Sequence, residues 1–273
     1  MNLLNKTALI TGAGSGIGRA LTQSMASRGC HLALADINLE TLKETERSII
    51  ESEIRVSIHE IDVTNRKNLE KLLEEVLEQH DSLEVLINNA GIAAGGDFLQ
   101  LGQDSFNKVM DVNFNAVVNL TRICLPHFLS RPEAFIVNIS SLFGLISPPE
   151  QTAYCASKFA VRGFSNSLRY ELKDTKVKVC VVHPGGINTN IARNAIVPDD
   201  ISEEEINRRK AEEQKLLTMP PPKAAEIIVK GITKNKARVL VGMDAKIISY
   251  LERLNPVHYW KFIEGTWAKK RQS

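Results

Sequence analysis

The sequence predicts an α/β protein in which helices cover both faces of one parallel sheet, a doubly wound arrangement within a single domain. Short apolar runs alternate with longer amphipathic stretches along most of the 273 residues. Strands buried on both faces read as continuous apolar runs, and helical stretches between them require the strands to pair in parallel. Hydrophobic residues make up 43% of the chain and charged residues 24%, which is enough apolar material for a large core.

The first half of the chain contains four strands and the helices that follow three of them. Strands are predicted at residues 7–11, 31–36, 55–62 and 84–88. Between these runs the apolar side chains recur at helical spacing. Helices are therefore predicted at residues 18–28, 39–51 and 69–79.

The second half continues the pattern. Residues 106–128 are expected to form one or two helices, and residues 153–172 one long helix. Further strands are predicted at residues 134–139, 178–183 and 238–241. Right-handed crossovers would place the carboxyl ends of these strands along one edge of the sheet, where ligands bind in such folds.

Residues 188–219 interrupt the alternation, lack strand character and end at three consecutive prolines. Acids and bases four residues apart predict salt bridges on a solvated helix face. The two pairs with this spacing are Glu204/Arg208 and Glu205/Arg209. We expect one domain over residues 1–255, with residues 188–219 as an excursion from it.

A tail over residues 256–273 follows this domain and contains both tryptophans of the chain, Trp260 and Trp267. Four bases accompany them, and an aromatic and basic composition can mark peripheral attachment to a membrane surface. The stretch has only a short amphipathic period, which favours packing on its own domain or on a neighbouring subunit.

Composition and charge exclude several classes of protein. The formal net charge of +2 comes from interspersed acids and bases, whereas a nucleic-acid surface needs clustered Lys and Arg. The six histidines have no Cys or carboxylate partners at metal-ligand spacing, so we expect no metal site. No apolar stretch reaches about 18 residues, which predicts that the chain has no transmembrane segment.

The cysteines and the N-terminal residues predict a cellular location. The chain has no C-x-x-C pair, and its free thiols in apolar runs fit a reducing compartment. The four cysteines are Cys30, Cys124, Cys155 and Cys180. The polar stretch at residues 5–7 interrupts any secretory signal, so the protein is expected to be cytoplasmic.

A glycine-rich turn at residues 11–18, Thr-Gly-Ala-Gly-Ser-Gly-Ile-Gly, follows the first strand and opens the first helix. Glycines let the backbone approach a pyrophosphate, and the helix N-terminus offers free N–H groups to its charge. The glycines are Gly12, Gly16 and Gly18, with Ser15 and Ile17 between them, a spacing that differs from the common G-x-G-x-x-G. The turn predicts a dinucleotide site.

Asp36 ends the second strand, where a carboxylate can accept both hydrogen bonds from an adenosine ribose. It would also repel a 2′-phosphate by about 4 kcal/mol per charge pair at about 4 Å and an effective dielectric constant near 20. Ile37, Asn38 and Ser15 place no base where such a phosphate would need one. NAD is therefore predicted over NADP.

A second group of residues predicts acid–base chemistry. Tyr154 and Lys158 are four residues apart, so their side chains rise from one face of the long helix. A neighbouring ammonium, together with a positive nicotinamide ring, is expected to lower the pKa of the phenol. Ser141 follows the fifth strand, and its hydroxyl can stabilise negative charge on a substrate oxygen. Cys155 is a weaker candidate nucleophile because no His partner accompanies it.

These motifs resemble those of the short-chain dehydrogenase/reductase family: T-G-x-x-x-G-x-G at residues 11–18, N-N-A-G at 88–91 and Y-x-x-x-K at 154–158. The resemblance covers residues 6–189 and implies a Rossmann fold. It implies a catalytic tetrad of Asn113, Ser141, Tyr154 and Lys158. Asn113 would hold a water on the proton path, and Ser141 is preferred over Ser140 because it lies thirteen residues before the tyrosine.

The resemblance also implies further cofactor contacts. Asp62 and Val63 would meet the adenine, and Ile187 and Thr189 the nicotinamide carboxamide. The remaining expected contacts are Asn89, Ala90, Gly91, Tyr154, Lys158, Pro184 and Gly185. Family members usually form dimers or tetramers, so a homodimer or homotetramer is expected.

The sequence thus predicts NAD-dependent hydride transfer between a nicotinamide and a secondary alcohol or ketone, with residues 188–219 as a lid. Residues 142–146, with Ile191 and Ala192, suggest an apolar substrate, or they pack the lid onto the body. A carbon–carbon double-bond reductase or an epimerase is a weaker alternative, and the Tyr154/Lys158 spacing opposes the former. A catalytically silent NAD-sensing protein is the alternative outside enzymes.

Overall fold

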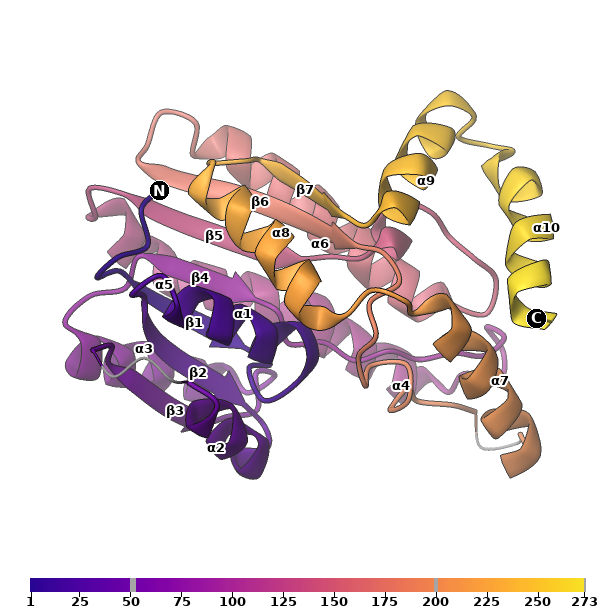
Figure 1. The fold of residues 1–273 in the computed structure, drawn as a ribbon, viewed down its shortest axis with the longest axis horizontal. Coiled ribbons are helices and arrows are strands. Elements are labelled where there is room, and N and C mark those ends of the chain that lie inside the picture. Colours follow the sequence, from indigo (N-terminus) through magenta and orange to yellow (C-terminus); the bar gives the residue numbers. More distant parts are fainter. Residues whose placement is uncertain (50–52, 199–200, 273) are drawn as a thin grey trace.

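The computed structural model describes residues 1–49, 53–198 and 201–272, and its centre is a parallel seven-stranded sheet (Figure 1). The strand order is β3-β2-β1-β4-β5-β6-β7. The strands are β1 Thr7–Thr11, β2 His31–Asp36, β3 Val56–Glu60, β4 Val85–Asn88, β5 Ala134–Ile139, β6 Val177–Pro184 and β7 Arg238–Val241. The predicted doubly wound parallel sheet is confirmed.

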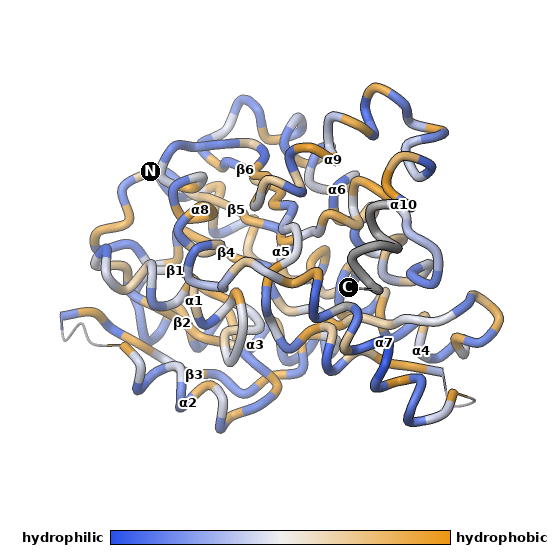
Figure 2. The backbone as a smooth tube through the Cα atoms, turned by 45° about the vertical axis from the view of Figure 1, so that its right-hand side comes forward, coloured by the Kyte–Doolittle hydropathy of each residue, from blue (hydrophilic) through white to orange (hydrophobic). Residues whose placement is uncertain are grey.

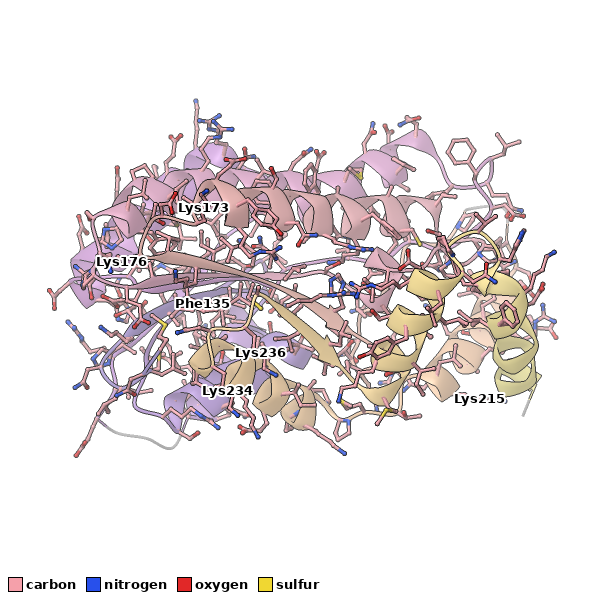
Figure 3. The ribbon with its side chains drawn as sticks, turned by 90° about the horizontal axis from the view of Figure 1, so that it is seen from above. Phe135, Lys173, Lys176, Lys215, Lys234 and Lys236 are labelled. Atoms are coloured by element: carbon pink, nitrogen blue, oxygen red, sulfur yellow. The ribbon has the colours of Figure 1, made fainter. Side chains whose placement is uncertain are left out.

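Helices cover both faces of this sheet. One face packs against α1, α2 and α8, and the other against α3, α5 and α6. Their bounds are α1 Gly16–Ala26, α2 Leu39–Arg47, α3 Arg66–His80, α5 Ala116–Leu129, α6 Thr152–Glu171 and α8 Pro221–Thr233. Phe135 of β5 lies between the two layers and is fully buried, whereas the labelled lysines lie outside the sheet (Figure 3).

Several predicted boundaries differ from the structure by a few residues. The first helix begins at Gly16 rather than at residue 18, because its N-cap is Ser15. The third strand is shorter than residues 55–62 and ends at Glu60. The second helix ends at Arg47, and the last residues predicted for it, 50 and 51, lie outside the described residues.

The stretch predicted as one or two helices at residues 106–128 is a continuous helical run with a distorted centre. It consists of α4 Gln103–Met110, a π-helical segment η1 Asp111–Asn115, and α5. A π segment is rare and often marks a functional site, because one extra residue in the turn redirects a side chain. Asn113 lies in this segment.

The excursion at residues 188–219 contains one helix, α7 Glu203–Leu216, which is largely hydrophilic (Figure 2). Of the predicted salt bridges on this helix, Glu205 pairs with Arg209 at 2.8 Å. The predicted pair of Glu204 with Arg208 is wrong, because Arg208 bonds to Glu205 as well, at 2.7 Å. Residues three apart on a helix are also neighbours, so one carboxylate binds both guanidinium groups.

Two helices that the sequence analysis did not predict follow β7. These are α9 Met243–Leu254 and α10 Tyr259–Gln272, which form the right-hand edge of the molecule (Figure 1). Ile263 of α10 is 7% exposed and belongs to a buried cluster with Leu142, Leu145 and Ile146. The first turns of the tail therefore pack on their own domain.

Within residues 1–49, 53–198 and 201–272, none of the helices combines the length and the apolar character that a membrane crossing requires. In the same part of the chain, no three His, Cys, Asp or Glu side chains gather closely enough to hold a metal ion.

Candidate active site

The glycine turn connects β1 to the N-terminus of α1. Gly12 has a φ of +65°, which L side chains rarely adopt, and a Cβ on Gly18 would collide with the main-chain oxygen of Gly12. The Ser15 side chain makes no capping hydrogen bond, and no acidic residue stands in the first turn of α1. The first N–H groups of this helix, including that of Ile17, are therefore available to an anionic ligand.

The N-N-A-G segment, which follows β4, holds the glycine turn in place. Asn89 Nδ2 donates to the main-chain oxygens of Thr11, at 2.9 Å, and Gly12, at 3.1 Å. Thr11 Oγ1 accepts from the N–H groups of Asn89, at 3.0 Å, and Ala90, at 3.1 Å. These four hydrogen bonds fix the turn against the end of the neighbouring strand.

Asp36 lies at the end of β2 beside the same turn. Its two carboxylate oxygens accept from the N–H groups of Gly14, at 2.9 Å, and Asn38, at 3.1 Å. The chain leaving β3 stays close to Asp36, because the Ile61 N–H donates to the Asp36 main-chain oxygen at 2.8 Å. Asp62 and Val63 follow directly, so the predicted ribose and adenine contacts lie on adjacent strand ends.

Arg19 is a base near this carboxylate that the sequence analysis did not consider. Its guanidinium donates to the Gly14 main-chain oxygen at 2.6 Å and to Thr45 Oγ1 at 2.9 Å. It also pairs with Glu44 at 2.8 Å. Its charge is therefore directed towards α2 and balanced there.

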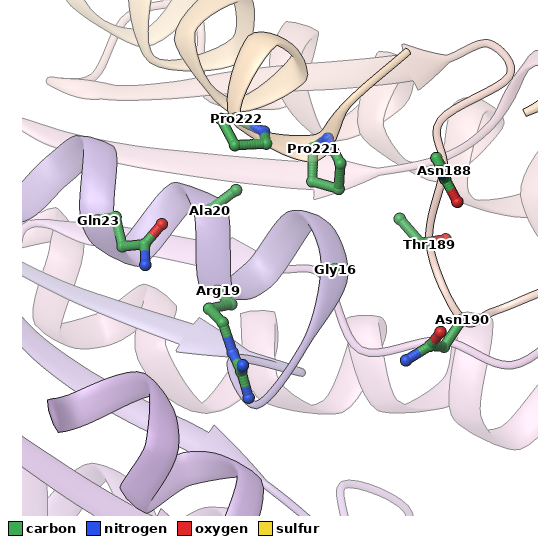
Figure 4. Close-up of a pocket in the computed structure, with 9 residues that line it drawn as sticks. All are labelled: Gly16, Arg19, Ala20, Gln23, Asn188, Thr189, Asn190, Pro221 and Pro222. Carbon is green, nitrogen blue, oxygen red and sulfur yellow. The ribbon is translucent and has the colours of Figure 1, made fainter. Parts of the chain in front are cut away.

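The segment after β6 closes the other side of the glycine turn. A Cβ on Gly16 would lie 3.1 Å from Thr189 Cγ2, so the two segments are in near contact. Gly16 and Thr189 both line a cavity of about 260 Å³ between α1 and the start of α8, where Pro221 and Pro222 stand (Figure 4). Ile187 is buried in the core beside this cavity wall.

Asp244 holds the Pro184–Gly185–Gly186 turn, and the sequence analysis missed it. Asp244 Oδ2 accepts from the Gly186 N–H at 2.7 Å, and a Cβ on Gly185 would collide with the Asp244 carboxylate. The residue lies in the first turn of α9, 58 positions along the chain from Gly186. No local pattern could have identified it, since an acidic residue in the first turn of a helix is common.

Ser141 and Tyr154 meet at the carboxyl end of β5. Ser141 caps a short 3-10 turn, η2 Leu142–Gly144, and its hydroxyl accepts from the Phe143 N–H at 3.1 Å. Its side chain lies close enough to that of Tyr154 to lower the pKa of the phenol in part. The competing Ser140 is buried and donates to the Lys158 main-chain oxygen at 2.8 Å, which is a structural role.

Lys158 and Asn113 lie behind the tyrosine. Lys158 Nζ is 5.6 Å from the centre of the Tyr154 ring and donates to the Ile139 main-chain oxygen at 3.1 Å. A Cβ on Gly91 would lie 3.1 Å from Asn113 Oδ1 and 3.4 Å from Lys158 Nζ, so Gly91 separates the two polar groups. The structure thus brings the four predicted catalytic residues together beside the glycine turn.

The side chain of Asn113 is occupied by its own surroundings. Its Oδ1 accepts from the Ile92 N–H at 2.9 Å, and its Nδ2 donates to the Ile92 oxygen at 2.9 Å and to Ser157 Oγ at 3.0 Å. The side chain therefore fixes the chain after the N-N-A-G segment. This leaves the main chain of the π segment as the part of Asn113 that could meet a water.

The pKa of Tyr154 differs from the expectation that Lys158 lowers it. Burial raises the pKa of Tyr154 to about 12, although the Ser141 side chain lowers it in part. Burial also lowers the pKa of Lys158 to about 8. For the chain by itself, loss of water is the largest influence on the pKa of both groups. The lowering expected with a bound nicotinamide ring stays a prediction.

The turn after Ser141 is the segment that the sequence analysis expected either to line a substrate site or to pack the protein. Leu142, Leu145 and Ile146 are buried against α9 and α10, so they pack the body of the protein. Phe143 contacts Tyr154 edge to face, with ring centres 6.0 Å apart. The neighbouring thiol of Cys155 is buried, which raises its pKa to about 12 and removes it as a nucleophile.

The residues around the glycine turn fit a nicotinamide dinucleotide. The turn tolerates only glycine where it closes, the helix behind it has an uncapped N-terminus, and a carboxylate ends the next strand. This is the order of groups that binds a pyrophosphate and then a ribose in doubly wound sheets. The fold and the site together define a class of oxidoreductase.

The particular family follows from comparison with known proteins. The family model for short chain dehydrogenases matches residues 6–198. The chain is 40% identical to SadH of Mycobacterium tuberculosis, over 97% of this chain and 96% of that one. It is 32% identical to the 3-oxoacyl-[acyl-carrier-protein] reductase FabG of Thermotoga maritima, over 76% and 84%. The chain belongs to the short-chain dehydrogenase/reductase family.

Solved structures agree with this assignment. A short-chain dehydrogenase/reductase from Burkholderia phymatum in complex with NAD superposes with a TM-score of 0.87 at 27% identity, over 94% of this chain and 95% of that one. A metagenomic short-chain oxidoreductase in complex with NADP gives a TM-score of 0.71 at 26% identity, over 88% and 98%. Both dinucleotides thus occur among proteins of similar structure.

Proposed function

We propose that the protein is an NAD-dependent oxidoreductase that interconverts a secondary alcohol and a ketone. The observation that carries the proposal is the joint position of Ser141, which lowers the pKa of Tyr154 in part, and of Lys158, whose Nζ is 5.6 Å from the Tyr154 ring centre. These groups lie at the strand edge that holds the glycine turn. A bound nicotinamide ring supplies or accepts the hydride.

The chain's own residues supply the proton and hold the oxygen. In the reductive direction, the Tyr154 hydroxyl donates its proton to the substrate oxygen, and the Ser141 hydroxyl donates a hydrogen bond to the same oxygen. A phenol with a pKa of about 12 keeps its proton at neutral pH, which suits it to act as the acid in ketone reduction. Lys158, with a pKa of about 8, remains mainly protonated and stabilises the phenolate that forms.

Asp36 supports the proposed preference for NAD. Its carboxylate stands at the end of β2, and Arg19, the nearby base, is balanced by Glu44. A 2′-phosphate beside Asp36 would meet a like charge without a free counter-charge. We therefore assign NAD rather than NADP as the preferred cofactor.

Residues 188–219 are proposed as the lid of this site. Asn188 lies at its base, where its side chain accepts from Gln214 Nε2 of α7 at 2.8 Å. The hydrophilic α7 would cover the carboxyl edge of the sheet and exclude water during the reaction. Phe143, beside Tyr154, is the apolar side chain that favours an apolar substituent on the substrate.

Substitution of the acid tests the proposal. Tyr154→Phe should lower kcat for NADH-dependent ketone reduction by roughly a thousandfold or more, because the proton donor is lost. NADH binding, measured by fluorescence titration, should stay within about threefold of the wild-type value. A panel of ketones graded in size and polarity provides the substrate. Full activity in Tyr154→Phe would contradict the mechanism.

A catalytically silent NAD-sensing protein is the second candidate. It would bind NADH with no turnover of any ketone in the panel, and Tyr154→Phe would then change nothing. The complete tetrad of hydroxyl, phenol, ammonium and amide favours the enzyme, because sensing needs none of these groups in this arrangement.

A further inference from the structure

His183 is a buried residue at the end of β6 that the proposed mechanism does not use. Its exposed fraction is 0%. Alternate residues of a strand point to the same face of the sheet. Val177 and Val179 of β6 pack on the face that α6 covers, so His183 lies on that face too. From this position its ring reaches the main chain of Ser141, which follows β5.

One ring nitrogen of His183 holds the main chain of Ser141. Its Nδ1 lies 2.9 Å from the Ser141 carbonyl oxygen. A carbonyl oxygen can only accept, so the proton must be on Nδ1. The same oxygen accepts from the Gly144 N–H at 3.0 Å, which closes the η2 turn. The backbone of the serine is therefore tied both to its own turn and to the neighbouring strand.

The other ring nitrogen shows that packing alone does not explain the histidine. Among the described residues, His183 Nε2 is buried and has no hydrogen-bond partner. A buried acceptor without a partner lowers stability, and a leucine would fill this position without that loss. Burial, with a smaller effect from the Arg238 and Arg162 guanidinium groups, lowers the pKa of His183 to about 3. The ring is therefore neutral, with a constant tautomer, over the working pH range.

We propose that His183 is a positioning residue, which fixes the Ser141 main chain so that the Ser141 hydroxyl faces both Tyr154 and the substrate oxygen. This inference rests on the proposed function, because it assigns a role to Ser141. The hydroxyl stabilises charge only when its oxygen stays within hydrogen-bond range of the reacting atom. Without the Nδ1 bond, the serine would sample several positions and stabilise the developing charge less often.

Three substitutions test the proposal in the full-length protein with NADH and a ketone that the wild type reduces. His183→Leu removes the donor and should lower kcat by roughly tenfold to a hundredfold with little change in KM for the cofactor. His183→Asn keeps a donor near the position of Nδ1 and should recover kcat to within about threefold of the wild type. His183→Phe replaces His183→Leu if the latter does not fold.

His80→Leu is the matched control. His80 is also buried, and its Nδ1 also lacks a hydrogen-bond partner among the described residues, but it lies at the end of α3, away from Ser141. The substitution should change the free energy of unfolding and leave kcat unaltered. A loss of kcat in His80→Leu as large as in His183→Leu would mean that any buried histidine has this effect, and the proposal would fail.

A double-mutant cycle with Ser141→Ala separates positioning from a general structural role. If His183 acts through the serine hydroxyl, His183→Leu should lower kcat no further in the Ser141→Ala background. An equal loss in both backgrounds, or a folded His183→Leu with wild-type kcat, would overturn the inference. Full activity of Ser141→Ala by itself would instead remove the proposed function, so the two failures are distinguishable.

Discussion

At the residue scale, Tyr154 shows how packing changes the chemistry that spacing suggests. Lys158 lies one helical turn away, and that spacing predicts a lowered phenol pKa. In the structure the ammonium lies towards the face of the ring, 5.6 Å from its centre, and donates to Ile139. Burial then dominates and raises the pKa of Tyr154 to about 12. The tyrosine therefore keeps its proton at neutral pH, which suits the role of proton donor proposed for it.

Asp36 allows a prediction on cofactor choice. Asp36→Ala removes the carboxylate that would repel a 2′-phosphate and that would bind the ribose hydroxyls. The ratio of kcat/KM for NADPH to that for NADH should rise by at least about tenfold, which corresponds to about 1.4 kcal/mol. Steady-state kinetics with both cofactors measures it.

Glu40→Ala provides the control for this substitution. Glu40 is an acidic residue of α2 that pairs with Lys43 at 2.8 Å. Removing it changes the net charge in the same way, and the cofactor ratio should stay as in the wild type. An unchanged ratio in Asp36→Ala would refute the assigned ribose contact.

At the scale of elements, the π segment Asp111–Asn115 places Asn113 between the N-N-A-G segment and α6. The extra residue in this turn directs the amide towards Ile92 and Ser157. A regular α-helix over the same residues would rotate the side chain away by a fraction of a turn. The helical run is thus interrupted where the site needs a polar group.

The C-terminal helix α10 packs against two other parts of the domain. Tyr259 accepts from the Ser147 N–H through its hydroxyl at 2.8 Å, and Ile263 packs on the turn that follows Ser141. The helix also lies against α7 of the proposed lid. The tail therefore contacts both the turn that follows Ser141 and the helix of the proposed lid.

A pair of neighbouring substitutions tests the packing of α10. Ile263→Ala should lower the free energy of unfolding by about 2 kcal/mol, because Ile263 is 7% exposed and its removal leaves a cavity. Phe262→Ala should change it by less than about 0.5 kcal/mol, because Phe262 is 63% exposed. Urea unfolding monitored by circular dichroism provides both values. Equal changes in the free energy of unfolding at the two positions would mean that α10 does not pack on its own domain through Ile263. A change that depends on protein concentration would mean that α10 packs on a neighbouring subunit instead.

At the scale of the whole molecule, buried histidines make stability depend on pH. Burial lowers the pKa of His80 to about 4 and that of His183 to about 3, against an ordinary value of 6.5. Below pH 6.5 the unfolded chain binds protons that the folded protein does not. The free energy of unfolding should therefore be highest above pH 6.5 and fall towards pH 5 by about 1.4 kcal/mol per pH unit for each histidine.

Urea unfolding at pH 7.5, 6.5, 5.5 and 5.0 measures this slope. The range stays above the ordinary pKa of carboxyl groups, so histidines dominate it. His80→Leu should remove about half of the slope. A free energy of unfolding that is constant between pH 7.5 and 5.0 would show that neither ring stays neutral in the folded protein.

Much of the fold could be predicted because its signals are local. The apolar runs at residues 134–139 and 238–241 match β5 and β7 without a shift. In β5 the run is easy to delimit because all of its residues are buried. Boundaries next to helix caps were less accurate. At Ser15 the cap lies within the motif itself, and the helix begins two residues earlier than predicted.

The site was predictable to the extent that chain spacing determines it. Tyr154 and Lys158 share a helix face, and the glycine turn joins a strand to a helix, so backbone geometry alone brings those groups together. Asp244 and His183 act on main-chain groups 58 and 42 residues away along the sequence. Such contacts leave no periodic or spacing signal.

By itself, the sequence determined the parallel sheet, the glycine turn that joins its first strand to its first helix, and the shared helix face of Tyr154 and Lys158. These properties follow from the period of apolar residues and from distances along one helix or turn, which the backbone imposes whatever surrounds it. The tertiary structure decided the protonation of Tyr154, the anchoring of Ser141 and the packing of α10. Those depend on which distant segments exclude water from a group, and only the assembled layers establish that.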